Sequence, residues 1–268
     1  MAEPHTDQRI HPTVIIHDGA EIADDVQIGP YCVVGPNVRI GKGTVVHDHV
    51  TMSGKLTIGD NNEFFSHSSI GAPPQDLKYK GEDTEVIIGN GNTFREFVSI
   101  HRGTKKDKEV TSIGDENFMM AYVHVGHDVT IGSNCVVANS TNFAGHVNVG
   151  SRVIIGGGTN ISQFVSLGEG AYIGGATAID RDIPIFCTAY GNRVKLKGIN
   201  IIGMRRQGYP KQVITEVVDF YRLMEASALS PRSFIEHDEQ TGEYQHNKVV
   251  QQMIEDIRKS EVGIAPFI

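Results

Sequence analysis

Apolar residues recur at every sixth position along most of this chain, and that period most constrains its fold. The repeat runs through residues 10–70, resumes at 88–100 and runs again through 113–179, with 11, 3 and 12 members, or 26 in all. Neither the 3.6-residue period of a helix nor the two-residue period of a strand produces this pattern alone. A short strand followed by a turn in every repeat does, and the many glycines that follow the apolar residue suit such turns.

The pattern resembles the hexapeptide-repeat family, in which three repeats make one triangular coil of a left-handed parallel β-helix. The handedness is implied by that resemblance and not by the period, since parallel crossovers are ordinarily right-handed. Twenty-six faces at three per coil predict nearly nine coils. At about 4.8 Å between coils, the solenoid is roughly 40 Å long. We therefore expect an all-β solenoid with an added α-helical part.

The six-residue period ends near residue 190, and the remaining sequence has helical spacing. Apolar residues in 210–228 and 248–258 recur at intervals of three and four. We expect two domains, a β-helix over residues 1–189 and an α-helical domain over 190–268. The second domain plausibly caps the open end of the solenoid, where strand edges are otherwise unpaired.

Composition excludes several classes of protein. The chain carries 24 Lys and Arg against 32 Asp and Glu, a net charge of −8, which argues against general nucleic-acid binding. No stretch is long and apolar enough for a membrane span, and the N-terminus lacks a signal-peptide pattern, so we expect a cytoplasmic protein. Cys32, Cys135 and Cys187 are far apart and odd in number, which predicts buried thiols and not disulfides or a zinc knuckle.

Two interruptions of the repeat indicate a site. We expect loops at 71–87 and 102–112, because the period fails across both stretches. Counting faces in threes places Ile70, Ile100 and Val125 in one column on successive coils. Both loops then leave the same corner of the prism, beside the segment that contains His124 and His127. Long loops are commonly functional, so this corner is the candidate site.

The same arithmetic gathers histidines at this corner. His101 lies one coil before His127, His146 lies one coil after it, and Gln163 is in register with His127 two coils further on. Single histidines are usually solvated side chains, whereas four on neighbouring coils favour a functional site. A zinc site is the competing interpretation, because neutral imidazoles bind zinc. The three-residue spacing of His124 and His127 differs from the spacing typical of zinc-binding carbonic anhydrases of this fold, and we expect no metal.

A basic segment lies beyond the repeats. Residues 183–215 contain six Lys and Arg and no Asp or Glu. In an acidic chain, such a segment fits the binding of phosphates or of an acidic carrier protein, although charge runs are often only solvated surface.

Five stretches, in order, resemble the UDP-N-acetylglucosamine 3-O-acyltransferase family. They are PQDLKY at 74–79, IHRGT at 100–104, HVGHD at 124–128, AGHV at 144–147 and GMRR at 203–206. The resemblance implies transfer of an (R)-3-hydroxyacyl group from acyl carrier protein to the 3-hydroxyl of UDP-N-acetylglucosamine, the first step of lipid A biosynthesis. It implies no cofactor apart from the phosphopantetheine arm that carries the acyl donor.

The resemblance also assigns catalytic roles. His127 is expected to be the general base that removes the sugar hydroxyl proton, as an imidazole can near neutral pH. The backbone N–H of Gly145 is expected to stabilise the oxyanion, and its position one coil above His127 agrees with the period. Asp128 is expected to orient His127, which requires a turn there, since adjacent strand residues face opposite sides.

The remaining site residues follow by matching position to the same family. Contacts to the sugar or acyl donor are expected from Asp76, Lys78, His101, His124, His146 and Gln163. The resemblance places the uridine diphosphate against Asn200 and Arg206 across a subunit boundary, in a homotrimer. Three positions depart from the family pattern: Ser162, Ile202 and Gln207 replace a histidine, a glutamate and an arginine. These departures bear mainly on the nucleotide contacts and fit a changed sugar, such as the 3-amino analogue.

Gly175 is expected to limit the length of the acyl chain. It lies 48 residues beyond His127, about 13 Å along the axis at 4.8 Å per coil. A hydrocarbon that advances about 1.25 Å per carbon reaches it with some ten carbons. Because glycine has no side chain to block the groove, we expect acyl chains of about 12 to 14 carbons. The alternative is that Gly175 serves only a turn.

Other functions remain open. The related N-acyltransferase of the same pathway, or an acetyltransferase on the same repeat, is the nearest alternative, although the N-acyltransferase carries an additional N-terminal domain. A non-catalytic β-helix scaffold is the alternative of a different class. The clustered histidines, the two loops and the basic segment oppose it.

Overall fold

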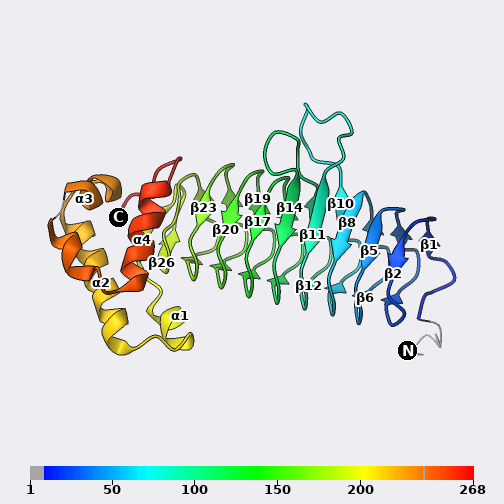
Figure 1. Cartoon of the computed structure of the whole chain (residues 1–268), viewed down its shortest axis with the longest axis horizontal. Coiled ribbons are helices and arrows are strands. Elements are labelled where there is room, and N and C mark those ends of the chain that lie inside the picture. The colour runs from blue at the N-terminus through cyan, green and yellow to red at the C-terminus, as the bar shows by residue number, and fades with distance from the viewer. Residues whose placement is uncertain (1–8, 238) are drawn as a thin grey trace.

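Each six-residue repeat folds into a short strand and a turn. The structure is a computed structural model that describes residues 9–237 and 239–268. The repeat residues from Ile16 to Ile179 all lie in strands β1 to β25, whereas Ile10 forms only an isolated bridge to Ile28. The strands stack in register into three parallel sheets that form the faces of a long prism (Figure 1).

The three sheets take every third strand in turn. The nine-stranded sheet contains β1 (Ile15–Ile16), β4 (Val33–Val34), β7 (Thr51–Met52), β10 (Ser69–Ala72), β13 (Ser99–His101), β16 (His124–Val125), β19 (Asn142–Phe143), β22 (Asn160–Ile161) and β25 (Ala178–Ile179). The eight-stranded sheet contains β2 (Glu21–Ile22), β5 (Val38–Ile40), β8 (Lys55–Ile58), β11 (Glu85–Ile88), β14 (Val110–Ile113), β17 (Thr130–Ile131), β20 (Asn148–Val149) and β23 (Ser166–Leu167). The ten-stranded sheet contains β3 (Gln27–Ile28), β6 (Val45–Val46), β9 (Glu63–Phe64), β12 (Thr93–Phe94), β15 (Phe118–Met119), β18 (Val136–Val137), β21 (Ile154–Ile155), β24 (Tyr172–Ile173), β26 (Cys187–Tyr190) and β27 (Lys195–Ile199).

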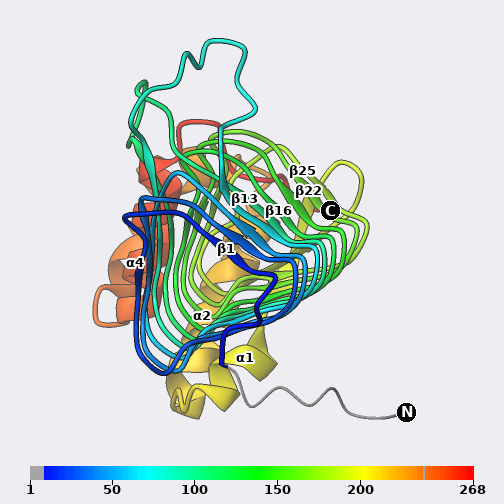
Figure 2. The same cartoon turned by 90° about the vertical axis from the view of Figure 1, so that its right-hand side faces the viewer.

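The coils wind in a left-handed sense. Viewed along the axis from the N-terminal end, the chain turns anticlockwise as it recedes from the viewer (Figure 2). The predicted all-β solenoid and its handedness are therefore both confirmed.

The core is a column of apolar side chains inside the prism. Repeat residues such as Phe64, Phe94 and Phe143 are completely buried, and the rings of Phe64 and Phe94 stack with their centroids 4.8 Å apart. The first coil is the outermost one that the structure describes, and there Ile15 is 56% and Ile16 40% exposed. Burial of the repeat residue in every later coil is what fixes the register, because a one-residue slip would turn it to solvent.

One corner of the prism also has a buried polar ladder. Where the eight-stranded sheet passes into the ten-stranded sheet, Asn62, Asn92 and Asn117 lie on successive coils and are almost fully buried. The Oδ1 of Asn62 accepts from the backbone N and Nδ2 of Asn92, at 3.0 and 2.9 Å. The Oδ1 of Asn92 accepts the same two bonds from Asn117. The amides thereby satisfy backbone groups that the turn leaves without a partner.

The two loops leave the same corner, as predicted, but they are shorter than predicted. Ile70 pairs with Ile100 and Ile100 with Val125, so the expected column is confirmed. The loops span 73–84 and 102–109, not 71–87 and 102–112. The expected bounds were wrong because β11 pairs along its whole length with β8 and β14. Residues 85–87 and 110–112, which were expected in the loops, therefore belong to these strands. We call this corner, between the nine-stranded and eight-stranded sheets, the loop edge.

The C-terminal part begins as sheet and ends as helices. Beyond the last full coil, β26 still pairs with β24, and β27 pairs antiparallel to β26, so strand structure continues to Ile199. This differs from the expected start of the helical domain at residue 190. The helices are α1 (Ile201–Arg206), α2 (Lys211–Ala226), α3 (Pro231–His237), the 3-10 helix η1 (Glu239–Tyr244) and α4 (Lys248–Lys259).

The helices cover one end of the solenoid (Figure 1). Helix α2 packs against β27 and buries Val217, Phe220 and Met224 completely. A carboxylate oxygen of Asp256 in α4 accepts a hydrogen bond from the backbone N–H of Ile185 at 2.9 Å. In the part of the chain that the structure describes, no helix is long and apolar enough to cross a membrane.

Candidate functional site

Four histidines meet at the loop edge and on the adjoining face of the nine-stranded sheet. The register places His101, His124, His127 and His146 on three successive coils, as the period predicts. The rings of His101 and His124 lie 5.1 Å apart, and those of His127 and His146 lie 4.9 Å apart, both pairs edge to face. Neighbouring coils, and not distant parts of the chain, therefore build the cluster.

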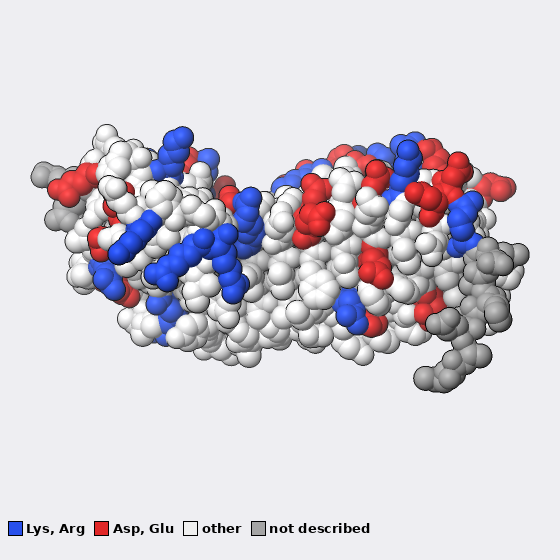
Figure 3. All heavy atoms as spheres, turned by 90° about the horizontal axis from the view of Figure 1, so that it is seen from below, with Lys and Arg blue, Asp and Glu red and all other residues white. Residues whose placement is uncertain are grey.

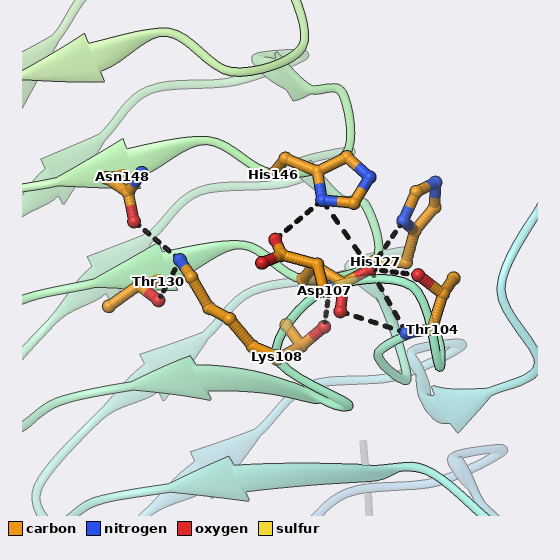
Figure 4. A network of polar contacts seen from close by, with 9 residues as sticks. Thr104, Asp107, Lys108, His127, Thr130, His146 and Asn148 are labelled. Atoms are coloured by element: carbon orange, nitrogen blue, oxygen red, sulfur yellow. Dashed lines mark hydrogen bonds and ion pairs between the residues drawn. The ribbon is translucent and has the colours of Figure 1, made fainter. Parts of the chain in front are cut away.

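His127 is held by a buried carboxylate. Its Nδ1 lies 2.9 Å from Oδ2 of Asp128, which is completely buried. Asp128 has a φ of +60°, and this left-handed turn brings its side chain to the same side as that of His127. The turn that the sequence analysis required is therefore present. The carboxylate also accepts bonds from the backbone N and the hydroxyl of Thr104, at 2.9 and 2.6 Å (Figure 4).

This arrangement fixes the tautomer of His127. An ionised carboxylate only accepts hydrogen bonds, so Nδ1 of His127 must carry the hydrogen that lies between them. The lone pair is then on Nε2, which is the nitrogen able to take a proton from a substrate. His127 is 7% exposed, so its ring is shielded from bulk water while one edge remains accessible.

Gly145 lies directly against the ring of His127. A Cβ at position 145 would lie 2.4 Å from Cε1 and 2.7 Å from Nε2 of His127, so any side chain there would displace the imidazole. The expected proximity is thus present, and it accounts for glycine at this position. Within the described residues the N–H of Gly145 donates to no protein acceptor, so it remains available to a ligand.

The second loop reaches over the cluster. Asp107 accepts a bond from Nδ1 of His146 at 2.7 Å, and Nζ of Lys108 donates to Thr130 and Asn148 on the eight-stranded sheet (Figure 4). These contacts tie loop 102–109 to the coils above it. The other face of His146 stacks on Phe164, with ring centroids 4.5 Å apart.

His101 and His124 are neutral at physiological pH. Burial lowers the pKa of His124 to about 4, and its Nδ1 lies 2.8 Å from the hydroxyl of Ser99. Burial also lowers the pKa of His101, whose Nδ1 donates to the carbonyl of Pro73 at 2.7 Å. Both rings can therefore offer a neutral nitrogen to a polar ligand.

The first loop supplies charged side chains at the entrance. Lys78 is exposed and Asp76 partly exposed. The backbone N–H of Lys78 donates to Oδ1 of Asp76 at 2.9 Å and lowers the pKa of Asp76, with Lys106 and His127 adding smaller effects of the same sign. Asp76 therefore lies within electrostatic range of His127.

A groove runs from the histidines along the outer face of the nine-stranded sheet. It has a volume of about 520 Å³ and follows the column His124, Asn142 and Asn160 on successive coils. It ends where Arg193 donates a hydrogen bond to Asp180. Ser162, one of the departures from the family pattern, lines it, whereas Gln163 is exposed and outside the lining.

Gly175 does not line this groove. It lies between β24 and β25, at the opposite edge of the nine-stranded sheet from His127. One coil contains 18 residues and 48 is not a multiple of 18, so Gly175 and His127 lie at different corners of the prism. The estimate of the distance along the axis therefore left out the distance across the sheet. Its role as a limit on acyl length stays a prediction.

The two expected nucleotide contacts lie on a different face. Asn200 and Arg206 line a pocket of about 720 Å³ between α1 and the outer face of the ten-stranded sheet, together with Ile202 and Gln207. Within one chain this face does not adjoin the loop edge, so the structure does not bring these residues to His127. The side chain of Asn200 caps α1, accepting from the N–H of Gly203 and donating to the carbonyl of Gly170, both at 2.9 Å.

Basic side chains gather at the C-terminal end of the face that carries α1. Figure 3 shows Lys and Arg concentrated there, while the adjacent middle of this face has almost no charge. The basic segment supplies part of this cluster through Arg205 and Arg206 in the last turn of α1.

The donor set at the loop edge is also compatible with a metal ion. Ligand atoms of His127, Asp128 and His146 lie within 4.8 Å of one another. The bonds from Thr104 to the Asp128 carboxylate use lone pairs that a cation would need. We therefore keep the expectation of a metal-free site.

Sequence reasoning missed several contacts of this site. Thr104, Asp107 and Ser99 each bond to one of its side chains, and Phe164 stacks on His146. Thr104 falls inside the IHRGT stretch and Ser99 directly precedes that stretch, so a signal existed for both. Asp107 lies in a loop without periodicity, and no signal in the sequence indicated its partner.

Comparison with known proteins gives a consistent result. Residues 182–265 match a family described as UDP N-acetylglucosamine O-acyltransferase, domain 2, and residues 9–42, 19–54 and 111–145 match bacterial transferase hexapeptide repeats. A protein of Thermodesulfovibrio yellowstonii named acyl-[acyl-carrier-protein]–UDP-N-acetylglucosamine O-acyltransferase is 51% identical over 80% of this chain and 83% of its own length. A protein of the same name from Saccharophagus degradans is 44% identical over 95% and 98%. The solved structure of LpxA from Acinetobacter baumannii superimposes with a TM-score of 0.89 at 42% identity, covering 96% of this chain and all of that one.

Proposed function

The chain belongs to the acyl-[acyl-carrier-protein]–UDP-N-acetylglucosamine O-acyltransferases, and we propose that His127 is the base of its acyl transfer. This family catalyses the first step of lipid A biosynthesis. The observation that carries the proposal is the buried bond between His127 Nδ1 and Asp128, which leaves Nε2 as a base beside the backbone of Gly145.

The proposed reaction needs one proton shuttle. Nε2 of His127 takes the proton of the sugar 3-hydroxyl as its oxygen attacks the thioester carbonyl of the (R)-3-hydroxyacyl donor. The carbonyl oxygen becomes an oxyanion that the N–H of Gly145 stabilises, and such a donor is worth roughly 3 to 4 kcal/mol. When the tetrahedral intermediate collapses, the C–S bond breaks and the protonated His127 returns the proton to the leaving thiolate. Asp128 keeps the imidazole oriented and stabilises its charged form.

The groove supplies a path for the substrates. Neutral His101 and His124, with Asp76 and Lys78 from the first loop, would hydrogen-bond the sugar and the polar part of the donor. The acyl chain would extend along the face of the nine-stranded sheet toward Arg193, past side chains on successive coils. Gln163 and His146 do not line this groove, and any contact that they make with a substrate would be from the loop edge. No group other than the phosphopantetheine thioester of the donor is needed for the chemistry.

The nucleotide half of the site would come from a neighbouring chain. Arg206 lies on the face of the ten-stranded sheet, away from His127 of the same chain, so one substrate can reach both only between two copies. A closed three-fold arrangement satisfies this requirement for every copy. We therefore propose a homotrimer in which Arg206 binds the diphosphate and Asn200 positions α1. Ile202 and Gln207 leave fewer polar contacts for the uracil end.

The acidic acyl carrier protein would dock on the basic segment, and the reaction would take place in the cytoplasm, where that carrier acts. The test is consumption of thioester by the purified chain with 3-hydroxyacyl carrier protein. Release of thiol that requires UDP-N-acetylglucosamine would support the proposal. Turnover with only the 3-amino sugar analogue, or with acetyl coenzyme A in place of the carrier, would contradict it.

A further inference from the structure

Asp107 in loop 102–109 bonds to a histidine of the site, although the proposed reaction gives it no role. Its Oδ2 accepts a hydrogen bond from Nδ1 of His146 at 2.7 Å (Figure 4). The same Nδ1 lies 3.8 Å from Oδ2 of Asp128, which is beyond hydrogen-bond distance. Because an ionised carboxylate only accepts hydrogen bonds, Nδ1 of His146 carries the hydrogen. That hydrogen has two carboxylates beside it and is bonded to the one from the loop.

The Oδ2 atom of Asp128 already has its full set of donors. It accepts from Nδ1 of His127 at 2.9 Å, and from the hydroxyl and the backbone N of Thr104 at 2.6 and 3.0 Å. A carboxylate oxygen offers about two lone pairs. A further bond from His146 to this oxygen would therefore compete with the bond that holds His127.

Asp107 prevents this competition, and the other contact of His146 does not. Phe164 stacks on the ring of His146 with the two planes 5° apart, which fixes the plane of the ring but not the edge on which Nδ1 lies. The side chain of His146 is 11% exposed, so without Asp107 its N–H would need a protein acceptor. A shift of about 1 Å would bring Nδ1 within hydrogen-bond distance of Asp128.

We propose that Asp107 is a positioning residue for acyl transfer, because it accepts the Nδ1 hydrogen of His146 and so leaves the Asp128 carboxylate to His127. This inference rests on the proposed function, since Asp107 acts here through the His127 base. Loop 102–109 then holds the site at two points: Thr104 holds the carboxylate of Asp128, and Asp107 holds the ring that would compete for it.

Three substitutions separate this bond from other effects of the loop. Asp107→Ala removes the acceptor, and kcat should fall about 10-fold with little change in KM, because a hydrogen bond to a charged group is commonly worth at least that factor. Asp107→Asn keeps an oxygen acceptor without the charge and should retain most of the wild-type kcat. Lys108→Ala is the matched control, because Lys108 anchors the same loop through Thr130 and Asn148. It should lower kcat far less than Asp107→Ala does.

The effect should also depend on His146. In His146→Phe the ring that stacks on Phe164 remains while the nitrogens are lost, so adding Asp107→Ala to this variant should lower kcat no further. An Asp107→Ala chain with the wild-type kcat would overturn the proposal. A loss of the same size in the His146→Phe background, or in Lys108→Ala, would also overturn it.

A crystal structure of Asp107→Ala tests the geometry without relying on activity. Nδ1 of His146 should lie within about 3.2 Å of Oδ2 of Asp128, and the bond from His127 should be longer or broken. A ring that keeps its place and bonds to water would contradict the proposal. His127→Ala separates this inference from the proposed function. If it is inactive while Asp107→Ala is unimpaired, only the role of Asp107 fails, and if both keep the wild-type kcat, the base itself is wrongly assigned.

Discussion

At the scale of single residues, the backbone between β16 and β17 decides which way two adjacent side chains point. The positive φ of Asp128 turns its carboxylate toward His127, although neighbours in a strand would diverge. His127→Ala should therefore lower kcat by at least about 100-fold while the chain stays folded, because a general base contributes 10²- to 10⁴-fold. Steady-state kinetics with circular dichroism as a fold check measures this. A variant with more than half of the wild-type kcat would show that another group is the base.

Thr104 is the residue that holds Asp128, through both its backbone N–H and its hydroxyl. Thr104→Val removes the hydroxyl bond and leaves the carboxylate less constrained. Because a hydrogen bond to a charged group is worth about 1.5 to 3 kcal/mol, we expect kcat to fall about 10-fold or more with little change in KM. Thr104→Ser keeps the hydroxyl and should restore kcat. If Ser and Val variants behave alike, Thr104 acts only through packing.

His124 links the site to the pH dependence of folding. Burial lowers its pKa to about 4 in the folded chain, against an ordinary value of 6.5. Between these values the unfolded chain binds a proton that the folded chain does not, so this contribution to stability is present above pH 6.5 and is lost as the pH falls toward 4.

His124→Asn should therefore make the stability less dependent on pH in this range. Urea unfolding at pH 7 and pH 5 measures the effect, and the midpoint should fall less for the variant than for the wild type. His246→Asn, which changes an exposed histidine, serves as the control. An equal fall in the wild type and His124→Asn would mean that His124 is protonated in the folded chain.

At the scale of elements, the asparagine ladder shows what a turn needs beyond glycine. The amide of Asn92 bonds to coils on both sides of it, and the side chain is completely buried. Asn92→Ala leaves the backbone N–H of Asn117 without its acceptor, and each buried group left unpaired costs about 1 to 3 kcal/mol. We expect a clear loss of stability, measured as a lower urea midpoint. Lys42→Ala, at an exposed position of the equivalent turn two coils earlier, should change it little. Similar midpoints for both variants would contradict this role of the ladder.

The strands were predictable from the sequence because burial imposes a single register on every coil. Ile16, Met52 and Val125 all occupy the strands that the period assigns to them. The loops were predictable only as interruptions, since residues 85–87 belong to β11 by pairing with neighbouring strands and not by the six-residue period. Helix α1 was also missed, because its six residues are too few to show helical spacing.

At the scale of the whole molecule, the site residues fall on two faces of the prism. Periodicity placed His101, His127 and His146 on neighbouring coils, because every third face of the solenoid lies in one column even where a loop is inserted. It could not place Arg206, which follows the last coil and whose position depends on how α1 packs beneath the ten-stranded sheet. A site that needs both His127 and Arg206 must therefore be completed by a second chain.

Subunit mixing tests this division directly. His127→Ala and Arg206→Ala chains should each form trimers with little activity. The Arg206→Ala trimer should have a raised KM for the nucleotide sugar, since a phosphate contact remote from the thioester contributes mainly to binding.

In mixed trimers, some sites between chains contain both residues. Such a site forms where an Arg206→Ala chain, which supplies His127, adjoins a His127→Ala chain, which supplies Arg206. Random assembly of equal amounts makes about a quarter of the sites intact, so activity should recover to about that fraction of the wild type. Light scattering verifies that the mixture is trimeric, and wild-type chains mixed with His127→Ala chains give the reference for unhindered exchange. If both residues acted within one chain, no mixed trimer would contain an intact site, and activity would stay at the level of the separate variants.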